Sequence, residues 1–269
     1  ERGPTTDPES MLQIRSVKAY YDGSLGSRGA KLIEEYSDQP GHRGVAGADY
    51  GFEPDAVEAF MAAGFQAGIH AIGDAGNRDV LDFYESVFAR PPDARGVRHR
   101  IEHAQIVSLE DIQRTADLGV IASVQPTHAT SDMPWAEDRV GHDRARGAYA
   151  WRRFIDAGAR IALGSDFPVE RVSPLLGFHA AVTRQDSENA PAGGWYGNQV
   201  LSREEALRGF TLDAAYAGFM EDRVGSLEAG KRADFVILSQ DLMSIPPEAI
   251  LETEVLATVL DGAAIYVAE

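Results

Sequence analysis

Short apolar runs alternate with stretches of helical periodicity through most of the chain. Apolar runs bounded by turn-forming residues are typical of buried strands, whereas apolar residues that recur every three or four positions predict amphipathic helices. The predicted strands are residues 14–20, 67–71, 97–103, 120–124 and 161–163. The predicted helices begin after Glu53, at Asp74 and at Ser108, and then cover residues 144–157, 174–183 and 202–217. This alternation predicts parallel strands with right-handed crossovers, and therefore an α/β fold.

Two further features complete the predicted organisation. The connection after the first strand, residues 22–51, is long and rich in glycine, and loops of this length are usually functional. We expect it to shape the substrate pocket together with a loop at residues 127–140. After about Val224 the chain consists of short β-rich runs, with a hairpin turn at Asp261-Gly262. The change of pattern therefore predicts two domains, an α/β portion at residues 1–222 and a small β-rich segment at residues 223–269.

The composition is that of a folded, acidic protein without cysteine. The 269 residues are 44% hydrophobic and carry 42 acidic and 25 basic side chains, a net charge of −17. Such a charge repels phosphate backbones and anionic lipid surfaces, so nucleic acid and membranes are not expected partners. The lack of cysteine excludes disulfides and thiolate metal sites and fits a cytoplasmic protein. The chain begins at Glu1 without an initiator methionine, and we expect an N-terminal part to be missing or removed.

Four chemistry-bearing residues stand at the ends of short apolar runs: Lys18, His70, His103 and Asp166. His70 and His103 are separated by about one βα unit, and His103 and Asp166 by about two. Because the strand ends of a parallel barrel converge on one face, such residues can share an ion. The spacing therefore predicts a metal centre.

The residue types fit this centre with one exception. Neutral imidazoles are good zinc ligands, and the Asp166 carboxylate can both bind an ion and take a proton from water. Lys18 is the exception, because an ammonium group has no acceptor atom and cannot ligate a cation. Lys18 must therefore be neutralised or modified to take part.

Structural interpretations compete with these functional ones. A strand-end histidine is often a hydrogen-bonded structural residue, Asp166 can cap a turn, and Lys18 can be a solvated edge residue. His99 is predicted to be a core residue. Asp74 is predicted to cap a helix, with a contact to His70 as the alternative. His128 is either a substrate contact or a plain loop histidine.

Several strings together resemble the amidohydrolase superfamily, and most closely its amidohydrolase-3 group of YtcJ-like proteins. The matching segments are residues 17–24, 70–74, 98–105, 123–126, 164–169 and 225–236. They cover nearly the whole chain in the family's order.

The resemblance implies a (β/α)8 TIM barrel with a β-sandwich built from both ends of the chain. It implies hydrolysis of C–N bonds, typically amides of small molecules, by metal-activated hydroxide, with Asp166 as the catalytic acid and base. It further implies a carbamate on Lys18, which can bridge two ions, and a ligand set of Lys18, His70, His103 and Asp166. The expected cofactor is one or two divalent ions, foremost zinc, although sites of nitrogen and oxygen ligands also accept manganese, iron or nickel.

One departure from the family concerns its first barrel strand, which ends in a His-x-His pair that holds the first metal. No His-x-His occurs in this sequence. Lys18 therefore corresponds to barrel strand four and residues 70–166 to strands five to eight, so the chain is expected to be the C-terminal portion of the enzyme. An open half-barrel leaves strand edges unpaired, which favours a homo-oligomer or association with the missing N-terminal segment.

Three functional hypotheses follow. The first is a hydrolase of amide-like, non-peptide bonds. The alternative is a truncated, non-catalytic module that needs a partner or the missing N-terminal part for activity. A third keeps the fold and changes the reaction to ring opening of a cyclic amide or to deamination.

Overall fold

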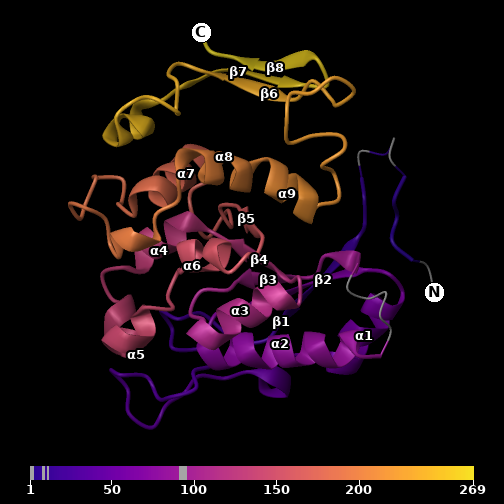
Figure 1. Ribbon diagram of the computed structural model, residues 1–269, viewed down its shortest axis with the longest axis vertical. Coiled ribbons are helices and arrows are strands. Elements are labelled where there is room, and N and C mark those ends of the chain that lie inside the picture. Colours follow the sequence, from indigo (N-terminus) through magenta and orange to yellow (C-terminus); the bar gives the residue numbers. More distant parts are fainter. Residues whose placement is uncertain (1–2, 8–9, 11, 91–95) are drawn as a thin grey trace. The chain divides into compact units, whose positions relative to one another are not determined.

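The computed structural model describes residues 3–7, 10, 12–90 and 96–269 (Figure 1). Its contacts divide the chain into two compact units, each discontinuous in sequence. The units are Glu1–Val124 with Pro134–Arg160, and Gln125–Met133 with Ile161–Glu269. Each unit combines strands with helices, as the α/β prediction requires. The predicted boundary between residues 222 and 223 stays a prediction.

Four strands of the parallel sheet belong to the first unit (Figure 1). They are β1 (Ser16–Tyr20), β2 (Gln66–Ala71), β3 (Arg100–His103) and β4 (Ile121–Val124), side by side in chain order. β2 is buried along its whole length, as expected for a strand covered on both faces. The register pairs Tyr20 with His70, and His70 with Glu102. The carboxyl ends of these strands therefore lie at one edge of the sheet.

Helices alternate with these strands. They are α1 (Pro54–Ala62), α2 (Asp74–Phe88), α3 (Leu109–Asp117), α5 (Ala136–Ala145) and α6 (Trp151–Asp156), with the 3-10 helix η1 (Gly47–Tyr50) in the loop after β1. α3 begins where predicted, because the Ser108 hydroxyl accepts a hydrogen bond from Asp111 N. Tyr84 of α2 is fully buried and donates to Ala67 O of β2 at 3.0 Å and to Arg100 O of β3 at 2.8 Å. This helix is thereby fixed across two strands.

His99 is a core residue, as predicted. Its side chain is 1% exposed, and its Nδ1 accepts a hydrogen bond from Ala67 N at 2.9 Å. The ring stacks on Tyr84 and Phe88 of α2, with centroid distances of 5.4 and 5.6 Å. His99 therefore packs between sheet and helix and is not a candidate ligand.

The second unit contains one strand of the βα series, six helices and a small antiparallel sheet. These are α4 (Pro126–Asp132), β5 (Ile161–Leu163), α7 (Pro174–Thr183), η3 (Gly197–Gln199), α8 (Arg203–Phe210), α9 (Leu212–Ala217), β6 (Phe235–Leu238), η4 (Pro247–Glu252), β7 (Val255–Leu260) and β8 (Ala263–Val267), counting α-helices and 3-10 helices together in its described residues. Ser202 and Glu205 form a capping box that starts α8. Asp261 and Gly262, with φ of 51° and 79°, make the predicted turn between β7 and β8.

Three predicted elements differ from the structure. The loop expected around Pro126 and Pro134 contains the helix α4 and leads into α5. The helix expected at residues 144–157 is interrupted, because the chain leaves α5 after Ala145, Tyr149 adopts φ of 49°, and α6 begins at Trp151. The helix expected at 202–217 is divided into α8 and α9 at Thr211. Within the described residues, no helix combines the length and apolar character needed to cross a bilayer.

Acid should weaken the second unit through His179 of α7. This side chain is 1% exposed, its Nε2 lies 2.9 Å from Asn189 Oδ1, and burial lowers the pKa of the ring. Below the unfolded value of about 6.5 the unfolded chain binds a proton that the folded chain resists, so stability falls as pH decreases from about 6.5 to the lower folded pKa. Urea unfolding at pH 7.5 and 5.5 measures this loss, and His179→Gln should reduce it. An unchanged pH dependence in the variant would contradict the assignment.

Candidate metal centre

His70 lies near the carboxyl end of β2, whereas Lys18 is the middle residue of β1 and pairs with Gly68, so the structure does not place Lys18 at a strand end. Tyr20 and His70 are register partners, and their ring centroids are 5.1 Å apart. Lys18, two residues earlier on the same face of β1, has its Nζ 4.9 Å from the centre of the Tyr20 ring. The aromatic ring therefore lies in contact with both predicted ligands.

His103 approaches His70 from the next strand. The two ring centroids are 4.5 Å apart, and both residues are buried, each with 8% exposure. The register pairs His70 with Glu102, so strict alternation would place His103 on the opposite face of the sheet. His103 and Ala104 instead adopt positive φ, 80° and 42°. Such strain at non-glycine residues is a feature of functional sites, and here it occurs where two imidazoles meet.

Asp22 is a buried carboxylate beside this pair that sequence reasoning treated only as the start of a loop. It is fully buried, and it accepts hydrogen bonds from Lys31 N, Ile72 N and Gly73 N, each at 2.9 Å. Its Oδ1 lies 3.7 Å from His70 Nε2. Burial raises the pKa of Asp22 to about 7, against the opposing effect of these backbone donors. Asp22 thus joins the loop after β1 to the end of β2.

Asp74 has a different role from the predicted one. The N-cap of α2 is Gly73, and Asp74 is the first residue of the helix. Its Oδ1 accepts from Ile33 N at 2.9 Å and from Ala75 N at 3.0 Å. The prediction of a helix cap was wrong, because the carboxylate holds the preceding loop against the start of α2.

A charged network lies on the same face of the sheet as His70. Arg100 Nε donates to Glu102 Oε1 at 2.7 Å, and Arg100 Nη1 donates to Gln66 Oε1. Burial alone would raise the pKa of Glu102, but the charge of Arg100, hydrogen bonds and the charge of Lys18 bring it below its ordinary value. The side chain is therefore ionised at neutral pH, in a strand that ends at His103.

Gly68 leaves the space that this network occupies, so Gly68→Ala should destabilise the protein. A Cβ there would lie 2.7 Å from Glu102 Oε1 and 3.2 Å from Arg100 Nη2. Overpacking of this kind typically costs about 1–3 kcal/mol in the free energy of unfolding. Urea unfolding measures it, with Gly197→Ala as the matched control, since nothing lies within 4 Å of a Cβ at Gly197. Equal free energies of unfolding for the two variants would show that Glu102 and Arg100 can move aside without loss of stability.

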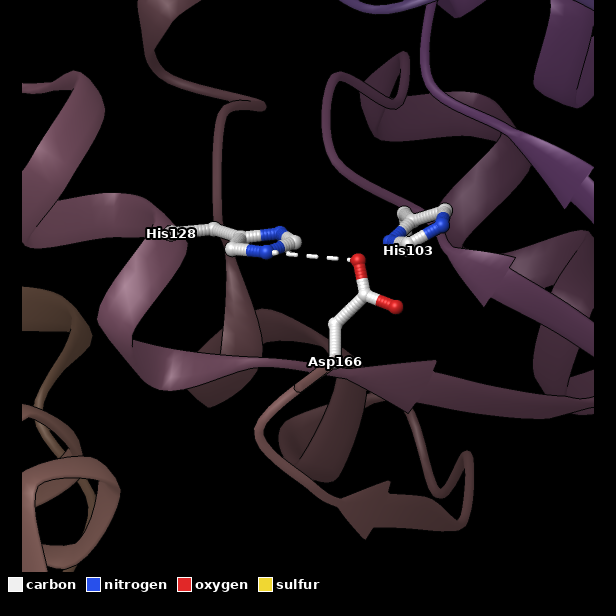
Figure 2. Close-up of side chains that lie close together, drawn as sticks. All are labelled: His103, His128 and Asp166. Carbon is white, nitrogen blue, oxygen red and sulfur yellow. Dashed lines mark ion pairs between the residues drawn. The ribbon is translucent and has the colours of Figure 1, made fainter. Parts of the chain in front are cut away.

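The second unit contributes Asp166 and His128. Asp166 follows β5, is exposed and adopts φ of 60°. His128 of α4 places its Nε2 3.6 Å from Asp166 Oδ2 (Figure 2). The sequence predicts a loop at this place, with His128 as a loop histidine or a substrate contact. The structure shows that His128 instead belongs to the helix α4. The Asp166 backbone, like that of His103, adopts a positive φ, so a second predicted ligand has a strained backbone.

The structure therefore groups the predicted ligands by unit. Lys18, His70 and His103 gather in the first unit, and Asp166 pairs with His128 in the second. The common ligand set of Lys18, His70, His103 and Asp166 draws on both units and stays a prediction.

Comparisons with known proteins agree with the resemblance seen in the sequence. The family model described as "Amidohydrolase family" matches residues 2–266. YtcJ of Bacillus subtilis is 34% identical over 255 residues, 95% of this chain and 47% of its own length. N-substituted formamide deformylase of Arthrobacter pascens is 31% identical over 268 residues, 97% of this chain and 47% of its own.

A solved structure extends the agreement to the fold. A metal-dependent hydrolase from Pyrococcus horikoshii superimposes with a TM-score of 0.78 at 30% identity, over 91% of this chain and 48% of that one. The predicted class, a partial barrel with a small β-sandwich portion, is thereby confirmed. The chain spans about half the length of the relatives it matches. It belongs to the amidohydrolase family.

Proposed function

We propose that this chain is the C-terminal portion of a metal-dependent hydrolase that cleaves C–N bonds in amide-like, non-peptide substrates. The observation that carries the proposal is the meeting of His70 and His103 at the ends of adjacent parallel strands, 4.5 Å between centroids, through a left-handed backbone at His103. A purely structural histidine pair does not require strained backbone. Family membership and the deformylase named among the relatives support amide chemistry.

The donor set fits a divalent ion. Two imidazoles, a carboxylate and, once modified, the Lys18 amine provide nitrogen and oxygen ligands suited to zinc. We propose a carbamate on Lys18, because the free ammonium cannot ligate and a carbamate offers two anionic oxygens. When bound, the ion would activate water and polarise the substrate carbonyl.

The remaining steps belong to the residues of the chain. We propose that His70 and His103 bind the ion and that Asp166 completes the ligand set. Asp166 would also take the proton from the attacking water and deliver it to the leaving nitrogen. His128, 3.6 Å from the carboxylate, would orient it between these two transfers. As the C–N bond breaks, the nitrogen would keep this proton and leave as the neutral amine, and the acyl group would leave as the carboxylic acid, so the two products together hold the atoms of the amide and of one water.

A second candidate function is a non-catalytic module that acts only with another polypeptide. The specific observation in its favour is exposed apolar surface on the antiparallel sheet, where Ile265 is 63% and Val267 65% exposed. Such surface is typical of an interface. We propose that association, either of two copies or with the segment missing relative to YtcJ, completes the protein. The complex of this chain with the part of YtcJ that it does not cover is called the complemented enzyme below.

Metal content tests the proposed centre. The isolated chain should bind zinc at less than one ion per chain and show negligible turnover, because the family's His-x-His pair is absent. His103→Asn should reduce the bound zinc to background, measured by equilibrium dialysis and elemental analysis. His142→Asn is the matched control, since the His142 side chain is 74% exposed on α5. Equal zinc in wild type and His103→Asn would remove His103 from the ligand set, and vigorous amide hydrolysis by the isolated chain would contradict the truncation.

A further inference from the structure

The second unit contains a polar cavity of about 260 Å³ that the proposed chemistry does not use. Its walls come from α4, from the loop after Asp166, and from α7 with the loop that follows it. Nine of its ten lining residues have polar side chains, and the tenth is Leu176. Ligand pockets are usually lined mainly by hydrophobic and aromatic side chains. This lining therefore selects a polar ligand.

Thr127 supplies a buried hydroxyl to this cavity. The residue is 9% exposed, and its Oγ1 has no hydrogen-bond partner among the described residues. Its backbone carbonyl is already used, because Thr130 Oγ1 donates to it at 3.0 Å. A buried hydroxyl without a partner costs free energy that a bound group with its own donors and acceptors would recover. Thr127 is thus a specific sign that a polar ligand belongs here.

The opposite wall is held in place by its own hydrogen bonds. Gln185 Nε2 donates to Asn189 O at 2.8 Å and to Pro191 O at 3.0 Å, so the amide oxygen is the atom left for a ligand. Asp186 Oδ1 accepts from Glu188 N at 2.8 Å and from Ala190 N at 3.0 Å. A wall ordered before binding reduces the entropy lost when a ligand enters.

The charges around the cavity favour an uncharged ligand. Glu170 and Arg171 carry opposite charges, and neither has an ion-pair partner in the part of the chain that the structure describes. With Asp186 the lining has one positive and two negative groups, which disfavours an anion. Hydroxyl side chains are frequent: Thr127, Thr130, Ser131 and Ser187. Carboxylates, guanidinium groups, amides and hydroxyls all form hydrogen bonds with the hydroxyls of a ligand.

We propose that this cavity is a subsite for an uncharged polyhydroxyl group carried by the substrate. The inference rests on the proposed function, because it places a sugar-like or polyol portion of the substrate beside the reacting amide. The chain itself connects the two places: Thr127 precedes His128, and Glu170 and Arg171 follow Asp166 on the same loop. The volume corresponds to roughly nine water molecules, which suits a polyol of a few carbons.

Binding of xylitol to the full chain tests the subsite. Ligand-observed NMR in the presence of a chelator should show xylitol binding, and 1-pentanol, with the same carbon number and one hydroxyl, should not compete. Thr127→Val should weaken xylitol binding by about fivefold, as expected for one lost hydrogen bond, whereas Thr127→Ser should retain it. Arg43→Gln is the control. Arg43 lines a different cavity, in the first unit, so this variant should bind xylitol with the affinity of the wild type.

Three results would overturn the subsite. The first is that xylitol does not bind, which would show that the cavity holds only water. The second is displacement of xylitol by 1-pentanol, and the third is an unchanged xylitol affinity in Thr127→Val. Because no metal is present in this experiment, its outcome does not depend on hydrolysis. Failure of the complemented enzyme to hydrolyse any amide would instead contradict the proposed function. It would not change the xylitol affinity measured for the chain.

Discussion

Asp166→Asn should lower kcat of the complemented enzyme by a factor of about 10²–10⁴, the contribution typical of a positioned acid and base. The amide that replaces the carboxylate is isosteric but cannot accept the proton from water at neutral pH. Asp166 is exposed in the loop after β5, so the substitution disturbs no buried packing. The loss should therefore appear in turnover even where substrate still binds.

The measurement is kcat on an N-substituted formamide, together with bound zinc per complex. Asp222→Asn is the matched control, an exposed aspartate of the second unit, and it should retain wild-type turnover. His128→Gln should lose less, about tenfold, because His128 contacts the carboxylate at 3.6 Å and acts only through it. If Asp166→Asn turns over as fast as Asp222→Asn, Asp166 is neither base nor ligand.

The strand ends were predictable because a single rule determines them. An apolar run followed by a polar residue marks the place where a parallel strand leaves the sheet, and β2 and β3 do end at or just after His70 and His103. Lys18 and His70 share one face through the register of β1 and β2. Because successive side chains of a strand point to opposite faces, the sequence itself shows which residues share a face.

The alternation of side chains along the strands does not predict the approach of His103 to His70. Periodicity places His103 on the face opposite to His70, and the left-handed backbone at His103 and Ala104 reverses this. A positive φ at a non-glycine residue leaves no mark in hydrophobic patterning. The same limitation applies to Asp166.

The contacts of two further residues were not predicted, for different reasons. The prolines around His128 indicated a loop. Pro126 is, however, also well suited to the first position of a helix, and the short helix α4 begins there. Asp22 is a loop residue by sequence, and its partners Ile72 and Gly73 lie on another segment. Long-range hydrogen bonds to backbone donors have no sequence pattern, so only coordinates reveal them.

Asp22→Ala should cost about 3 kcal/mol or more in the free energy of unfolding. The substitution leaves the N–H groups of Lys31, Ile72 and Gly73 without their acceptor, and each unsatisfied buried donor costs about 1–3 kcal/mol. Removal of a buried carboxylate offsets part of this cost. The net loss is a large fraction of the roughly 5–15 kcal/mol that stabilises a typical domain.

Urea unfolding of the two variants Asp22→Ala and Asp22→Asn measures the effect, and the asparagine variant should lose less because it keeps one oxygen acceptor. Asp49→Ala is the matched control, an exposed carboxylate in the same loop, and it should change stability by less than about 0.5 kcal/mol. The Asp22 carboxylate also lies 3.7 Å from His70 Nε2, so Asp22→Ala should weaken zinc binding along with stability. If Asp22→Ala unfolds at the same urea concentration as Asp49→Ala, the three backbone donors find other acceptors, and Asp22 does not hold the loop to the end of β2.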